Sequence, residues 1–177
     1  MEDLMKKQSA ALLTAAMVGQ TSEIESIKTI VDLWKAHYHQ LDVETDVDYM
    51  SSILTTARVW DIKPELVNVP EVIHIHRLVR AEFEKQVDFV VADDQKVLCC
   101  HLAAAYIAIT PEIETVTQIV STFRKFIESV EINDDYDKLA AYLVMGRMHD
   151  SKNKIEPYEV PALIRRMREL MMEEDGA

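Results

Sequence analysis

The chain has 177 residues, of which 49% are hydrophobic, and this predicts one globular domain over residues 1–177 and excludes a disordered chain. Its formal net charge of −12 argues against nucleic acid and anionic membranes as partners, because both attract a surplus of basic groups. The two cysteines, Cys99 and Cys100, are adjacent and cannot cross-link the fold in the ordinary way. They indicate a reducing compartment, so we expect a cytoplasmic protein.

The N-terminal segment, residues 2–18, is expected to form a first helix that ends near Gly19. It loosely resembles a signal peptide, but acidic residues precede its two lysines and polar residues interrupt its apolar run. A second helix is expected from Thr21, where Ser22 and Glu25 fit a capping box. The apolar residues of this helix recur in steps of three and four, at Ile24, Ile27, Val31, Trp34, Tyr38 and Leu41.

An acidic turn over residues 42–46 precedes a third helix, which should end before Pro64. Pro70 suits the first turn of a fourth helix. Within this fourth segment, residues 72–76 alternate much as a strand would, whereas the residues that follow are helix formers without a turn signal. The pattern favours a helix over 71–91 and leaves 72–76 open between helix and strand.

The segment Val97–Ile109, with the sequence VLCCHLAAAYIAI, is apolar on nearly every side. A helix without a polar face belongs in the middle of a packed domain, and this one is shorter than the ~20 residues that cross a bilayer. We therefore expect it to be the central helix of the fold, with His101 largely buried in it.

The rest of the chain continues in helices. Thr110–Pro111 should begin the next helix, and Asn133 or Asp134 should begin the one after it. The apolar residues of these and of the last helix are Ile113, Val116, Val120, Phe123, Ile127 and Val130, then Leu139, Leu143 and Met148, then Val160, Leu163, Ile164, Met167, Leu170 and Met171. No hairpin pattern and no repeat of fixed period is found. The sequence predicts an all-α, single-domain bundle of seven or eight helices around the central helix 97–109.

Six histidines raise the question of a metal site. Glu71-x-x-His74 has the form found in di-iron helical bundles, but those bundles need two such motifs and only one is present. The pairs His37/His39 and His74/His76 are two residues apart, which places their side chains about 200° apart on a helix, so neither pair can chelate from one face.

His149–Asp150 has the form of the histidine–aspartate pair of all-α, metal-dependent phosphohydrolases of the HD class, in which further ligands hold a metal that activates water. His101 and His74 are the candidate further ligands. However, a two-residue motif arises often by chance, and a histidine at a helix end also interacts favourably with the helix dipole. This reading remains the alternative.

Other catalytic patterns are missing. The chain has no phosphate-binding glycine-rich loop, and its paired carboxylates at 128, 131 and 134 overlap at one helix end instead of facing each other. No serine or cysteine lies in a nucleophile motif. We therefore expect a protein that is not an enzyme and that needs no cofactor.

One basic segment interrupts the acidic chain between Arg147 and Arg168, where six basic and three acidic residues occur. Its basic residues, which form the candidate partner-binding set, are Arg147, Lys152, Lys154, Arg165, Arg166 and Arg168. The last three lie within one helical turn and are expected to point outward together, where they could bind an acidic protein by forked hydrogen bonds. The alternative is a solvated face that nearby glutamates compensate.

The residues VLCCHLAAAYIAITPEIETVTQIVSTFRKF resemble the paired core helices of head–tail connector proteins of tailed phages. The resemblance covers some 30 of 177 residues, and the glycine-rich hairpin and arms expected of that family are missing. We therefore identify no family from the sequence.

The leading hypothesis is a non-enzymatic protein-interaction subunit of a larger assembly, such as a phage virion or a replication complex. Its partner would be another protein or a second copy of the chain, in the host cytoplasm or the virion. The alternatives are the HD-type phosphohydrolase and a nucleic-acid-binding regulator that uses the basic segment 147–168.

Overall fold

The computed structural model describes residues 2–20, 24, 26–61, 68–88, 93–110, 112–148 and 155–176. Every regular element within these ranges is helical, which confirms the all-α prediction and makes residues 72–76 helical. The helices are α1 (Glu2–Gln20), α2 (Ile27–Gln40), α3 (Asp46–Asp61), α4 (Val69–Gln86), α5 (Asp94–Ala108), α6 (Val116–Ser129), α7 (Asp135–Met148), the short 3-10 helix η2 (Pro157–Glu159) and α8 (Val160–Gly176). Among these described helices, none combines the length and the apolar character needed to cross a membrane.

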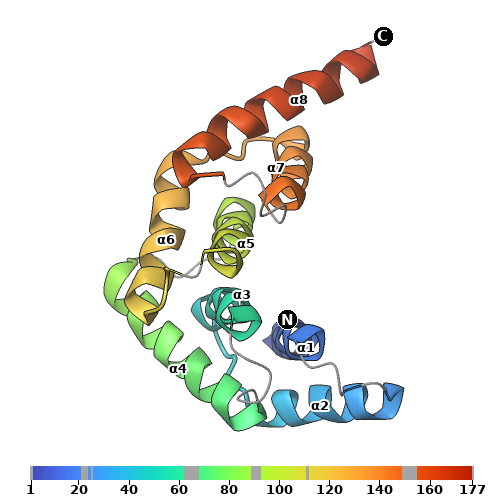
Figure 1. Cartoon of the computed structure of the whole chain (residues 1–177), viewed down its shortest axis with the longest axis vertical. Helices are drawn as coiled ribbons and strands as arrows, with labels where there is room; N and C mark the ends of the chain where they lie inside the picture. The colour runs from blue at the N-terminus through green and yellow to red at the C-terminus, as the bar shows by residue number, and fades with distance from the viewer. Residues whose placement is uncertain are drawn as a thin grey trace.

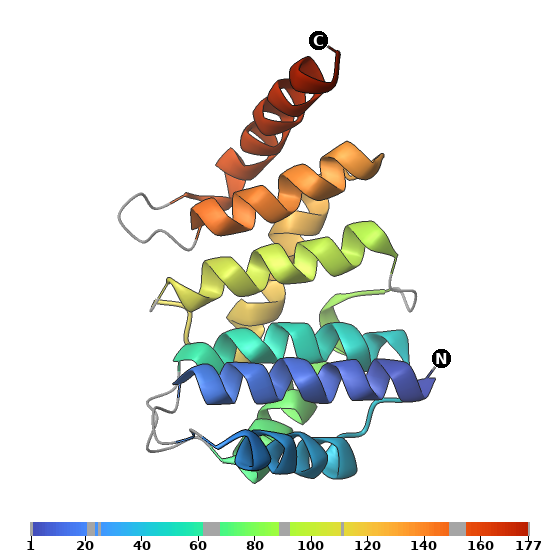
Figure 2. The ribbon, with the colours of Figure 1, turned by 90° about the vertical axis from the view of Figure 1, so that its right-hand side faces the viewer.

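The helices form two curved layers. Helices α1, α3, α5 and α7 lie side by side in one layer, and α2, α4 and α6 follow each other along its outer, convex side (Figure 1). The first-layer helices all run the same way across the molecule, so each second-layer helix carries the chain back to the start of the next (Figure 2). The side of the first layer that faces away from α2, α4 and α6 is concave.

This arrangement repeats a helix pair without repeating a sequence. The first-layer helices begin at residues 2, 46, 94 and 135, so their spacings are unequal. Unequal spacing explains why no fixed period is visible in the sequence. Arrays of stacked helix pairs present extended concave surfaces, a shape that many of them use for binding.

Helix α5 occupies the middle of the first layer, in contact with α3, α6 and α7 (Figure 1). Its fully buried side chains join Phe83, Phe123 and Phe126 in the larger of two hydrophobic cores. The smaller core lies between α1, α2, the end of α3 and the start of α4. The predicted central position of this helix is confirmed, although it begins three residues earlier than expected, with Asp93 as its N-cap.

Two further helix starts differ from the expectation. Helix α2 begins at Ile27 with Ser26 as its N-cap, whereas Ser22 and Glu25 lie outside the described residues. Helix α6 begins after Thr115, which forms a capping box with Gln118. Thr110 instead closes α5, because its hydroxyl donates to the carbonyl oxygen of Tyr106 at 2.7 Å.

The apolar residues expected on α7 divide between two sides of the helix. Met148 is buried, but Leu139 and Leu143 are exposed, and the smaller Ala140, Ala141 and Val144 face the core instead. Large side chains therefore lie on the surface of this helix while small ones pack inside.

Candidate functional site

The basic segment is only partly within the described residues: His149, Asp150, Lys152 and Lys154 lie outside them. Arg147 lies on the exposed side of α7 near its C-terminal end, and the other three arginines lie on α8. They do not form one outward cluster.

Arg168 turns toward α7, which corrects the expectation that it points outward. Its Nη2 atom lies 2.6 Å from Oδ2 of Asp134, and its Nε atom lies 3.1 Å from Oδ1 of Asp137. The hydrogen bond from Arg168 holds the pKa of Asp134 below its usual value. Arg168 therefore joins two helices of the fold.

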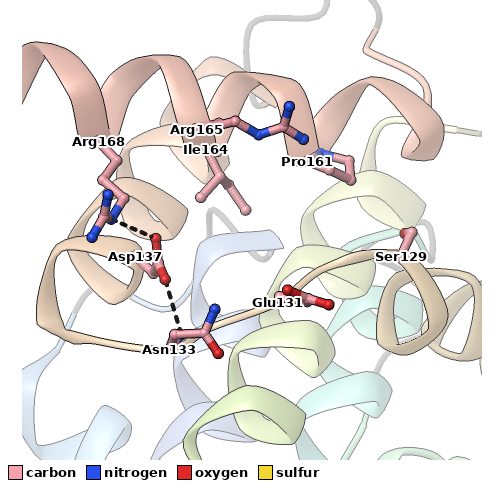
Figure 3. Close-up of a pocket in the computed structure, with 8 residues that line it drawn as sticks. All are labelled: Ser129, Glu131, Asn133, Asp137, Pro161, Ile164, Arg165 and Arg168. Carbon is pink, nitrogen blue, oxygen red and sulfur yellow. Dashed lines mark hydrogen bonds and ion pairs between the residues drawn. The ribbon is translucent and has the colours of Figure 1, made fainter.

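Arg165 and Arg166 remain near the surface. Arg166 lies 3.5 Å from Glu169 of the same helix, with both side chains exposed. Arg165 lines a cavity of about 520 Å³ between α8 and the segment that joins α6 to α7 (Figure 3). Glu131 lies on the opposite wall, and Arg168 and Asp137 add one further charge of each sign. The cavity is therefore polar but not basic.

The two histidines proposed as further metal ligands lie in different layers of the fold. His74 is exposed on α4, whereas His101 lies on the concave side of α5. The described part of the chain contains no group of three or more histidine, cysteine, aspartate and glutamate side chains placed to hold a metal ion, and His149 and Asp150 are not in that part.

The cysteines are held as thiols. Burial raises the pKa of Cys99 to about 12 and that of Cys100 well above its usual value. Neither can supply a thiolate near neutral pH.

An apolar groove lies on the concave side of the first layer, which the sequence reasoning missed; we call it the concave groove. One part, of about 380 Å³, is lined by Thr56, Trp60, His101, Ala104, Ala105, Ala108, Ile109 and Met145. A second part, of about 310 Å³, is lined by Gln8, Ala11, Leu12, Ala15, Tyr49 and His101. His101 belongs to both parts, and it is the only residue in either lining that can carry a positive charge.

The floor of the groove is one side of α5. His101, Ala104 and Ala108 line it, and Val97 continues the same side of the helix one turn earlier. All four are partly exposed and follow each other in steps of four, three and four residues. Helix α5 thus has a solvent-facing side, and His101 is half-buried where we expected it to be largely buried. Burial lowers the pKa of His101, which favours the neutral imidazole.

Trp60 forms the wall of the groove beside α1. A Cβ atom at Gly19 would lie 2.2 Å from Cη2 of the Trp60 ring, so the ring rests on the bare backbone of α1. Trp60 is still 41% exposed. The glycine therefore lets a large aromatic side chain come close to the backbone of α1 at the edge of the groove.

Sequence reasoning found α5 but not the groove. The only available signal was that a helix apolar all round also had small residues, Ala104 and Ala108, on the side that proves partly exposed. Trp60, Met145 and Leu12 come from three other helices, and no local pattern links them to α5.

Comparison of the chain with models of known protein families, with curated proteins and with solved structures finds no match. The case for a function therefore depends on the surfaces just described.

Proposed function

We propose that the chain is a non-enzymatic protein-interaction subunit that binds an amphipathic helix of a partner protein in the concave groove. The observation that carries this proposal is the partly exposed apolar side of α5 between the walls formed by α3 and α7. An apolar surface rimmed by polar residues is typical of an interaction site. A cytoplasmic setting and a larger assembly, such as a virion or a replication complex, belong to the same proposal.

The spacing on α5 suits a helical partner. Steps of four, three and four residues follow one face of a helix, and such a face packs against another helix by interdigitation. Ala104 and Ala108 lack bulk, so a partner helix can come close to the floor. Its apolar face would recur at steps of three and four residues and would carry larger aliphatic or aromatic side chains.

The direction of the partner follows from the parallel first layer. The C-terminal ends of α3, α5 and α7 lie along one edge of the groove (Figure 2), and each carries partial negative charge. A partner helix antiparallel to them places its positive N-terminal end at that edge. We therefore expect the antiparallel orientation.

The test compares one substitution at two sites. Ala104→Asp introduces a carboxylate on the groove floor at a half-exposed position, and Ala81→Asp introduces it at an exposed position of α4. Both variants should keep the helical circular dichroism of the wild type. Ala105→Asp, by contrast, should unfold the chain, because this residue is only 5% exposed and an unpaired buried carboxylate is strongly destabilising.

The probe is a displayed library of amphipathic helical peptides, randomised on the apolar face and selected on the wild type. Selected peptides should bind Ala81→Asp as they bind the wild type, and should bind Ala104→Asp roughly tenfold more weakly or worse, because a desolvated carboxylate would lie under the peptide. Peptides that bind Ala104→Asp as tightly as the wild type would exclude the groove as the docking site.

A further inference from the structure

One face of α7 exposes three large side chains. Leu139, Tyr142 and Leu143 are 50%, 54% and 52% exposed, and they share the side of the helix opposite its buried residues. Gly146 lies on the same side, where an added Cβ atom would meet nothing within 4 Å. Apolar side chains gathered on an open helix face favour a partner that removes them from water.

The place of α7 in the fold explains why this face is open. In the first layer α3 covers α1, α5 covers α3, and α7 covers α5 (Figure 1). Beyond α7, at that end of the stack, lies α8 (Figure 1), which packs on the buried side of α7 and binds the start of that helix through Arg168. Neither α5 nor α8 covers the side of α7 that carries the two leucines, which stays exposed.

We propose that this face binds the same face of a second copy of the chain, so that two chains form a symmetric dimer through antiparallel α7 helices. The charges along α7 favour a second copy of the chain as the partner. Asp135 lies one turn before Leu139, and Arg147 lies one turn after Leu143, and both are exposed. When Leu139 packs against Leu143 of the other copy, Asp135 of each chain lies opposite Arg147 of the other.

The pairing is self-complementary, as a two-fold interface requires. A parallel pairing would bring like charges together at both ends and is disfavoured. Because each copy contributes chiefly one helix, we expect less than the ~1,200 Å² of total buried surface found in standard stable complexes, and hence a reversible, concentration-dependent dimer.

Sedimentation equilibrium of the full chain, from low micromolar to submillimolar concentration, tests the proposal. The wild type should show a monomer–dimer equilibrium, and Leu143→Asp should be monomeric. Leu78→Asp is the matched control, because Leu78 is also exposed (45%) but lies on α4; it should dimerise as the wild type does. Circular dichroism should show that both variants keep their helices.

Charge reversal tests the register. Asp135→Arg and Arg147→Asp should each raise the dimer dissociation constant roughly tenfold or more, because each places like charges together at both ends. An equimolar mixture of the two variants should restore association, since every end of the mixed dimer then pairs opposite charges. A wild type that is monomeric throughout, a Leu143→Asp variant that still dimerises, or a mixture that associates no better than its components would overturn the proposal.

Discussion

The buried histidines are structural groups held in the neutral form. His76 of α4 is almost fully buried, and its Nε2 atom lies 3.0 Å from the carbonyl oxygen of Asp48. His37 of α2 is fully buried, with Nδ1 within 3.0 Å of Leu33 O and 2.9 Å of Thr14 Oγ1. Burial is the main cause that lowers the pKa of each. Both side chains tie neighbouring helices together.

We expect the free energy of unfolding to fall when the pH drops below about 6.5, the ordinary pKa of histidine in an unfolded chain. Because the folded-state pKa values of His37 and His76 are lower, the unfolded chain binds more protons in that window. The stabilisation is fully present above pH 6.5 or so and is lost as the pH falls toward the folded-state values. Urea unfolding at a series of pH values measures this slope.

Substitution identifies the residue responsible. His76→Gln keeps a donor for the Asp48 carbonyl but cannot titrate, so its unfolding free energy should depend less on pH than that of the wild type. His39→Gln, at an exposed position of α2, should keep the wild-type slope. Equal slopes in all three proteins would contradict the role assigned to His76.

At the scale of whole helices, the junction of α7 and α8 depends on a network around Arg168. The carboxylate of Asp134 accepts the backbone N–H of Asp137 at 3.0 Å, and that of Asp137 accepts the backbone N–H of Asn133 at 2.9 Å. Both carboxylates thus cap the start of α7 while they bind the guanidinium group of α8. One arginine thus links α8 to both carboxylates at the start of α7.

Arg168→Gln should lower the free energy of unfolding by about 1–3 kcal/mol, because the hydrogen bonds of the guanidinium group to Asp134 and to the mostly buried Asp137 are lost. Arg166→Gln should change it by less than about 0.5 kcal/mol, since the contact of Arg166 with Glu169 is exposed. Urea denaturation of the two variants makes the comparison. If the two substitutions lowered the free energy of unfolding equally, the contacts of Arg168 would add nothing to the stability of the junction.

Local sequence patterns predicted well where the helices lie, and less well which of their sides are buried. The expected helix start at Asp134 lies where α7 begins, because a cap is a contact between near neighbours in the chain. The burial of Ala141 and the exposure of Leu143 were not predictable in this way. Both depend on which side of α7 meets α5 and α8, and that is decided by residues far away in the sequence.

Across the whole molecule, two layers of helices enclose two separate cores. The smaller core includes Leu13 of α1 and Leu41 after α2, and the larger one surrounds α5. Helices α3 and α4 belong to both: Val59 lies in the smaller core and Leu54 in the larger one, and α4 contributes to each in the same way. Because these rigid helices extend from one core into the other, the two cores should unfold together.

Two cores could unfold separately, but the helices that they share lead us to expect one cooperative unfolding transition. Trp34 packs on the smaller core, and Trp60 lies near the end of α3, beside Gly19 and at the wall of the concave groove. Tryptophan fluorescence therefore reports mainly the N-terminal helices, whereas circular dichroism at 222 nm reports every helix. The two signals should follow the same curve in urea. Leu13→Ala and Phe123→Ala each remove a large side chain from one of the two cores. Each should lower the free energy of unfolding by about 2–5 kcal/mol, with the same value from both signals. Fluorescence that changes before circular dichroism, most of all in Leu13→Ala, would show that the N-terminal helices unfold as a separate unit.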